Sequence, residues 1–234
     1  MKPSDLASLS DASSPGIRAS DRPSRRRGTP DWGLVGVTLV AAAPILYLAA
    51  TQYVEYDGFW HVFIARQDQW RNFWFQWQNS NSHPPLYFLI LRFVAAIGQS
   101  ALWYRAISVI SGVASVYLVG MIAGKLSRWQ FTHLVTALAF GLAIPMIEVS
   151  IAVRSYMLGV FFVLFSFYYF LDLLSENNQA TVKPRVLFAL YAILAVGSAY
   201  FAIFYVAACA GVLGIVCLAR TPTAWKTWLS HALT

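Results

Sequence analysis

Charged residues are scarce in this sequence. Only 12% of its 234 residues are Asp, Glu, Lys or Arg, whereas about 25% is usual in a soluble globular domain. Hydrophobic residues make up 58% of the chain, and aromatic residues 16%. The composition therefore excludes a soluble fold and predicts an all-α, multi-pass membrane protein.

Cysteine is nearly absent as well. The two cysteines, Cys209 and Cys217, lie within one apolar run, which excludes a disulfide framework and a cysteine-rich metal site. The net charge of +7 comes mainly from an arginine-rich N-terminal segment and from short loops. It therefore gives no reason to expect a nucleic-acid partner.

Large apolar side chains are few in residues 1–30, which are rich in Ser, Pro, Asp and Arg. This composition predicts a disordered, basic tail. The tail leads into the first apolar run without a small-residue cleavage site, so we expect an uncleaved anchor and a cytoplasmic N-terminus. Binding of the tail to anionic lipid headgroups is the alternative.

The apolar runs predict about six membrane spans, at residues 32–50, 105–124, 131–147, 155–174 and two within 186–219. The last run has to turn, near residues 200–205, because one helix of that length would be about 51 Å long. Segment 84–98 is too short to span and contains Arg92, so it predicts an interfacial helix with Arg92 reaching the lipid headgroups.

The positive-inside rule supports this layout. With segment 84–98 kept outside, the basic loops at 125–128, 183–185 and 220–226 all lie on the cytoplasmic side. The polar segments 51–104 and 148–155 then share the outer face. The predicted organisation is a tail over 1–30, a membrane domain over 31–220 with its outer loop at 51–104, and a cytoplasmic segment over 221–234. We expect the chain to be part of a longer protein of the plasma or inner membrane.

The outer loop holds the first candidate site residues. Its aromatic residues recur at helical spacing, which predicts amphipathic helices at the membrane surface. Asp57 can accept a proton or hold a divalent cation there, or it can cap a helix. His61 lies four residues later on the same helical face, and such a histidine more often has a packing role than a role in a functional site. His83 precedes Pro84 and Pro85, so a rigid turn holds it where it can bind a metal or a phosphate.

The second polar segment contains Glu148, Arg154 and Tyr156. Charged residues at the end of a span need protein, water or a ligand around them. The guanidinium of Arg154 suits a phosphate, and its alternatives are a pair with Glu148 or contact with headgroups. Arg105, at the start of the second span, has the same options. We expect Asp57, His83, Arg105 and Arg154 to line one outer cavity.

These residues give the chain a resemblance to the GT-C superfamily of membrane glycosyltransferases, in the branch of protein O-mannosyltransferases and lipid A aminoarabinose transferases. The matching features are Asp57 after the first span, HPPLYFLILRF at 83–93, Arg105 in WYRAISVISG, and VRSYML around Arg154. Gly58 stands where the family often has a second acid. The nearest acid in the second loop is Glu148.

The resemblance implies transfer of a sugar, with inversion, from a polyprenyl-phosphate carrier to a glycan, lipid or protein on the outer face. It implies a catalytic Asp57 and a substrate-binding set of His83, Arg105, Glu148, Arg154 and Tyr156. It leaves a divalent metal ion open, with Asp57, His61 and His83 as candidate ligands. A transporter or flippase is the alternative function, although the middle of each span is almost wholly apolar, which disfavours it. A non-catalytic membrane fragment is the other.

Overall fold

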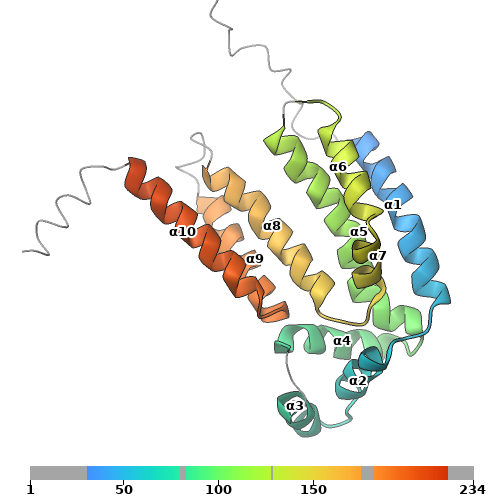
Figure 1. The fold of residues 1–234 in the computed structure, drawn as a ribbon. Coiled ribbons are helices and arrows are strands. Elements are labelled where there is room, and N and C mark those ends of the chain that lie inside the picture. Colours follow the sequence, from blue (N-terminus) through green and yellow to red (C-terminus); the bar gives the residue numbers. More distant parts are fainter. Residues whose placement is uncertain (1–30, 80–82, 128, 175–181, 221–234) are drawn as a thin grey trace, which may run out of the picture. The chain divides into compact units, whose positions relative to one another are not determined.

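The computed structural model describes residues 31–79, 83–127, 129–174 and 182–220, with side chains described as far as Val216. The chain divides into a first unit, Met1–Asp31, of which only Asp31 is described, and a second unit, Trp32–Thr234. Within the described residues there are ten α-helices and no strands (Figure 1). The predicted tail at 1–30 and the segment at 221–234 lie outside the described residues.

Three helices are long and apolar enough to cross a membrane: α1 (Trp32–Thr51), α5 (Ala101–Leu126) and α8 (Tyr156–Leu174). A fourth candidate is the bent pair of α6 (Thr132–Gly141) and α7 (Ile144–Ile151). The helices α9 (Val182–Ser198) and α10 (Ala202–Arg220) complete the bundle. The described residues thus form an all-helical protein with three apolar helices of spanning length, or four when the bent pair is counted as one.

The span predicted at 131–147 is interrupted, because α6 and α7 meet at an angle of 60°. Pro145 lies in the first turn of α7, where a proline is favoured because the N–H that it lacks would have no helical partner. The helix then continues to Ile151. The polar break predicted at 148–155 is therefore only 152–155, and Glu148 is a helical residue.

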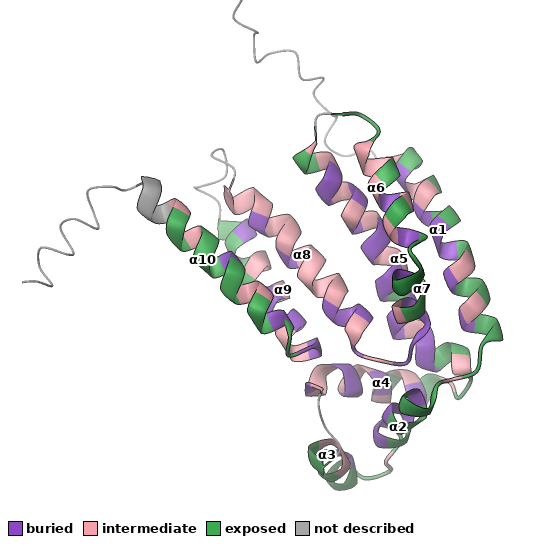
Figure 2. Cartoon of the chain, in the orientation of Figure 1, coloured by how far each residue is buried: buried purple, intermediate pink, exposed green. Residues whose placement is uncertain are grey.

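The centre of the bundle is α5, which packs against α1, α6, α7 and α8. Small residues bring α5 and α7 close together. A Cβ added to Gly112 would lie 2.3 Å from the hydroxyl oxygen of Ser150, so this contact requires a glycine, as is common where membrane helices pack tightly. Figure 2 shows α5 largely buried and α10 largely exposed. The exposed apolar side chains of α1 and α10 are those expected to face lipid.

Three short helices lie at one end of the bundle: α2 (Tyr56–Ala65), α3 (Trp70–Asn79) and α4 (Pro85–Ile97) (Figure 1). They form a core of their own in which Phe73, Tyr87 and Phe88 are completely buried. This core extends to Tyr104 and Ile107 of α5 and so fixes the three helices to the bundle.

Arg92 of α4 has hydrogen-bond partners within the protein. Its guanidinium donates to the carbonyl oxygens of Ala65, Gln67 and Asp68. It also lies 4.5 Å from the ring centroid of Trp70. Carbonyl oxygens at the end of a helix have no partner within it, so Arg92 closes the C-terminal end of α2 and joins α2, α3 and α4.

Candidate functional site

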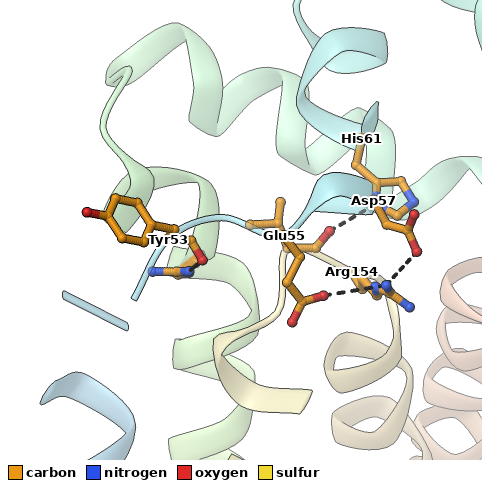
Figure 3. A network of polar contacts seen from close by, with 7 residues as sticks. Tyr53, Glu55, Asp57, His61 and Arg154 are labelled. Carbon is orange, nitrogen blue, oxygen red and sulfur yellow. Dashed lines mark hydrogen bonds and ion pairs between the residues drawn. The ribbon is translucent and has the colours of Figure 1, made fainter. Parts of the chain in front are cut away.

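A cluster of charged side chains forms where α2 meets the segment 152–155, which links α7 to α8. One nitrogen of Arg154, Nη2, lies 2.5 Å from Asp57 Oδ2 and 3.4 Å from Glu55 Oε2. Figure 3 shows the two carboxylates on different sides of the guanidinium. The side chain of Arg154 is 28% exposed, and those of Asp57 and Glu55 are 58% and 55% exposed. Both acids are thus open to solvent while one cation holds them.

Asp57 belongs to the first turn of α2 and is not its cap. The residue at the N-cap is Glu55, whose side chain makes no capping hydrogen bond. Asp57 follows within the helix, where the positive end of the helix dipole stabilises a carboxylate. Its side chain is therefore available for the ion pair with Arg154.

Gly58 explains why no second acid follows Asp57. A Cβ at this position would lie 2.8 Å from Cγ1 of Val54 and 3.1 Å from Cβ of Val153. The absence of a side chain lets α2 approach the segment that carries Arg154. The second acid beside Arg154 is Glu55, two residues before Asp57, and not Glu148. Glu55 was not among the predicted site residues, although an acid two residues before Asp57 was a visible signal.

The backbone on both sides of Arg154 is held by buried side chains. Nδ1 of His61 donates to the carbonyl oxygen of Val153 at 2.9 Å, and the hydroxyl of Ser108 donates to the carbonyl oxygen of Arg154 at 3.2 Å. His61 is 6% exposed and Ser108 is fully buried. Contacts from α2 and α5 therefore fix the position from which the Arg154 side chain starts.

His61 is a neutral, packed histidine. Because a carbonyl oxygen can only accept, the hydrogen bond to Val153 places the proton of the neutral ring on Nδ1. Burial lowers the pKa of His61 to about 4, and the charges of His83 and Arg154 act in the same direction, against the hydrogen bond and Asp57. The ring centroid lies 5.1 Å from that of Phe88. This agrees with the packing role that such a histidine more often has.

His83 lies beside His61, with 5.4 Å between the ring centroids. Its Nδ1 is 3.3 Å from the hydroxyl oxygen of Ser155, and its ring is 5.3 Å from that of Tyr156 in an edge-on arrangement. Burial and the charge of Arg154 lower the pKa of His83, while Asp57 opposes them. The fold therefore brings His83, Arg154, Tyr156 and Asp57 to one place, as a neutral imidazole, a cation, a phenol and an acid.

The candidate metal set of Asp57, His61 and His83 does not fit a metal ion. Across the described ranges, no group of three or more His, Cys, Asp or Glu side chains could hold one. Nδ1 of His61 is bonded to a carbonyl oxygen, and Asp57 is paired with Arg154.

Arg105 is a buried residue, with only 2% of it exposed. Its guanidinium donates to the carbonyl oxygens of Ala49 and Gln52 at 2.7 Å, and of Tyr53 at 2.6 Å. These are the last carbonyl groups of α1 and the first beyond it, so Arg105 closes α1 and sets the path of the chain toward Glu55. The geometry gives Arg105 a supporting position, although its buried Nε has no hydrogen-bond partner within the described residues.

Glu148 is on α7 and lines a cavity of about 400 Å³ that Glu55 also lines. The acids that pair with Arg154 are Glu55 and Asp57, so the alternative of an Arg154–Glu148 pair is not what the structure shows.

Comparison of the chain with models of protein families, with curated proteins and with solved structures gave no match.

Proposed function

We propose that this chain is a membrane glycosyltransferase that moves a sugar from a polyprenyl-phosphate donor to an acceptor on the extracytoplasmic face. The observation that carries the proposal is the pairing of Asp57 with Arg154, at the end of a bundle of apolar helices. An accessible acid, a phosphate-binding cation and a neutral imidazole in one place are the groups that this reaction needs. The motifs around these residues support the same reaction class.

In the proposed reaction, the acceptor hydroxyl attacks the anomeric carbon of the sugar. Asp57 takes the hydroxyl proton, and the bond between that carbon and the phosphate oxygen breaks, so that the lipid phosphate leaves with the electron pair. The exposure of Asp57 lets an acceptor reach it. Negative charge grows on the leaving phosphate oxygen, where a fixed cation lowers the barrier.

Arg154 is the cation available for that phosphate. Its Nε is buried and has no hydrogen-bond partner within the described part of the chain, so the guanidinium has a donor that the protein does not use. Leaving a buried donor unpaired is unfavourable, and a phosphate oxygen that reached it would remove this cost. His83 and Tyr156 lie against each other next to Arg154 and would form one wall for the donor.

We also propose how the helices cross the membrane. We place α9 and α10 across the bilayer as two further spans joined at residues 199–201, and count the bent pair α6 and α7 as one, which makes six. The N-terminus is cytoplasmic, and α2, α3 and α4 lie on the outer side of the plasma or inner membrane. The positive-inside pattern of the basic loops supports this orientation.

The test uses the full chain in native membranes, with a set of radiolabelled polyprenyl-phosphate sugars and extracted lipids, glycans and proteins as acceptors. We expect Asp57→Asn to lower the transfer rate about 10²–10⁴-fold, the usual contribution of a general base. Asp68→Asn is the matched control, because Asp68 is an exposed acid of the same outer loop. Unchanged transfer in Asp57→Asn would refute the catalytic assignment. Accumulation of intact donor inside proteoliposomes, with no covalent product, would favour a transporter instead.

A further inference from the structure

We infer that the cavity between the end of α1 and α7 binds the acceptor, and that this acceptor is a lipid with an uncharged, hydroxyl-bearing headgroup. The cavity has a volume of about 400 Å³. Its polar lining consists of Gln52, Glu55 and Glu148, and its apolar lining of Leu48, Ile144, Ile147 and Ile151. The inference rests on the proposed function, because it assigns one of the two substrates of that reaction.

The polar lining selects against an anion. Glu55 and Glu148 are both acids, Gln52 is neutral, and the lining includes no Lys, Arg or His. Two carboxylates repel a phosphate, whereas they accept hydrogen bonds from hydroxyl groups, and the amide of Gln52 can both donate and accept. A sugar or glycerol headgroup matches this set, and the anionic donor does not.

The apolar lining selects for a lipid. Four aliphatic side chains come from α1 and α7, and both helices belong to the apolar bundle. Ile144 is 70% exposed, so the cavity wall continues onto a surface that faces hydrocarbon in a membrane. A hydrocarbon chain along this wall would place its headgroup at the level of Gln52, where the protein backbone leaves α1.

The cavity is connected to the proposed base through Glu55. This side chain lines the cavity, and its Oε2 lies 3.4 Å from the same nitrogen of Arg154 that holds Asp57 at 2.5 Å. The two carboxylates are therefore neighbours, and a headgroup hydroxyl bound at Glu55 lies next to Asp57. Cζ of Arg154 also lies 5.9 Å from the ring centroid of Tyr156, which contacts His83, and this is where the proposed function places the donor phosphate.

A labelling experiment tests the cavity without requiring transfer. Ile147→Cys is placed in the full chain with Cys209→Ala and Cys217→Ala, the protein is put into phosphatidylcholine nanodiscs, and the rate of maleimide labelling is measured. The test ligands are dodecyl β-glucoside and dodecyl phosphate at equal concentrations. We expect the glucoside to slow labelling at least about fivefold and the phosphate to leave it unchanged. Leu46→Cys is the matched control, because Leu46 is an exposed apolar residue of α1 outside the cavity.

Reversing the charge of Glu148 provides a second comparison in the labelling experiment. In Glu148→Lys we expect protection of the cysteine by the glucoside to weaken and protection by dodecyl phosphate to appear. Protection by the phosphate in the parent protein, or equal protection at Leu46→Cys, would overturn the inference. If Ile147→Cys does not fold, Gln52→Cys lines the same cavity from the segment just after α1 and gives the same contrast.

Transfer kinetics separate this inference from the proposed function. Ile147→Trp fills the cavity, so we expect it to raise the KM for the acceptor about tenfold and to leave the KM for the donor unchanged. One set of results would refute the acceptor cavity alone. In it, Asp57→Asn loses transfer, the glucoside gives no protection in the labelling test, and Ile147→Trp leaves the KM for the acceptor unchanged. Protection by the glucoside with no transfer from any donor would refute the transferase and leave a binding site for a hydroxyl-bearing lipid.

Discussion

Because of His61, the protein should become less stable as the pH decreases from 6.5. One substitution at this residue measures the effect. In His61→Asn, the side-chain amide nitrogen occupies nearly the place of Nδ1 and can still donate to the carbonyl oxygen of Val153. The amide does not titrate. Wild type and variant thus share this hydrogen bond but differ in whether residue 61 can take up a proton.

The direction and the size of this pH effect on stability follow from the pKa of His61. Burial lowers the pKa of His61 from 6.5 to about 4 in the folded protein, helped by the charges of His83 and Arg154 and opposed by that of Asp57. As the pH falls, the unfolded chain therefore binds the proton first. The loss of stability caused by His61 is therefore absent above pH 6.5, grows between pH 6.5 and about 4, and is constant below about pH 4. The free energy of unfolding should decrease by about 2 kcal/mol at pH 5 and by about 3 kcal/mol at most.

The assay is reversible unfolding of the full chain in nonionic detergent at several pH values from 8 to 4.5, followed by tryptophan fluorescence. The pH dependence of wild type minus that of His61→Asn isolates His61, since the other titrating groups are common to both. His83→Asn serves as a second comparison, because the pKa of His83 is lowered in the same direction. Parallel stability curves for wild type and His61→Asn would show that His61 is not the buried neutral group derived above.

Two further substitutions test the packing that builds the site. Gly58→Ala should destabilise the fold by about 1–3 kcal/mol, because its Cβ would overlap Val54 and Val153; Gly36→Ala has open space around it and should change the unfolding midpoint little, and equal effects of the two would contradict the close approach. Arg92→Met should cost about 2 kcal/mol through the loss of its bonds to the end of α2, whereas Arg71→Met, on an exposed face of α3, should stay within about 0.5 kcal/mol in the same unfolding assay.

The sequence was sufficient for the class of fold because hydrophobicity is a property of local runs. The runs around α1, α5 and α8 are long and apolar, and each forms a helix of spanning length. The interruption between α6 and α7 also had a local signal that the prediction did not use, since Pro145 stands near the C-terminal end of the predicted span. These features depend on neighbouring residues, which a sequence displays directly.

The partners of the arginines could not be predicted in the same way. Arg105 and Arg154 each lie at the end of an apolar run, and the sequence gives both the same options. The fold buries Arg105 against three carbonyl groups of residues more than 50 positions earlier, and leaves Arg154 partly exposed beside two acids. Which arginine satisfies the backbone and which remains open depends on how α1 and α5 pack, and no local pattern records that.

The charges of the site connect the two proposals. Two carboxylates share one guanidinium, and the lowered pKa values of His61 and His83 leave both rings without a positive charge at neutral pH. If the donor binds as proposed, its phosphate brings negative charge to Arg154, and at Nη2 it would compete with Asp57 for the same nitrogen. That competition would weaken the ion pair that holds the base, whereas binding at the unpaired Nε alone would leave the pair in place. If the phosphate takes Nη2, the acid that accepts the proton is freed when the phosphate binds, while the acceptor lies against Glu148 and the aliphatic side chains of α7.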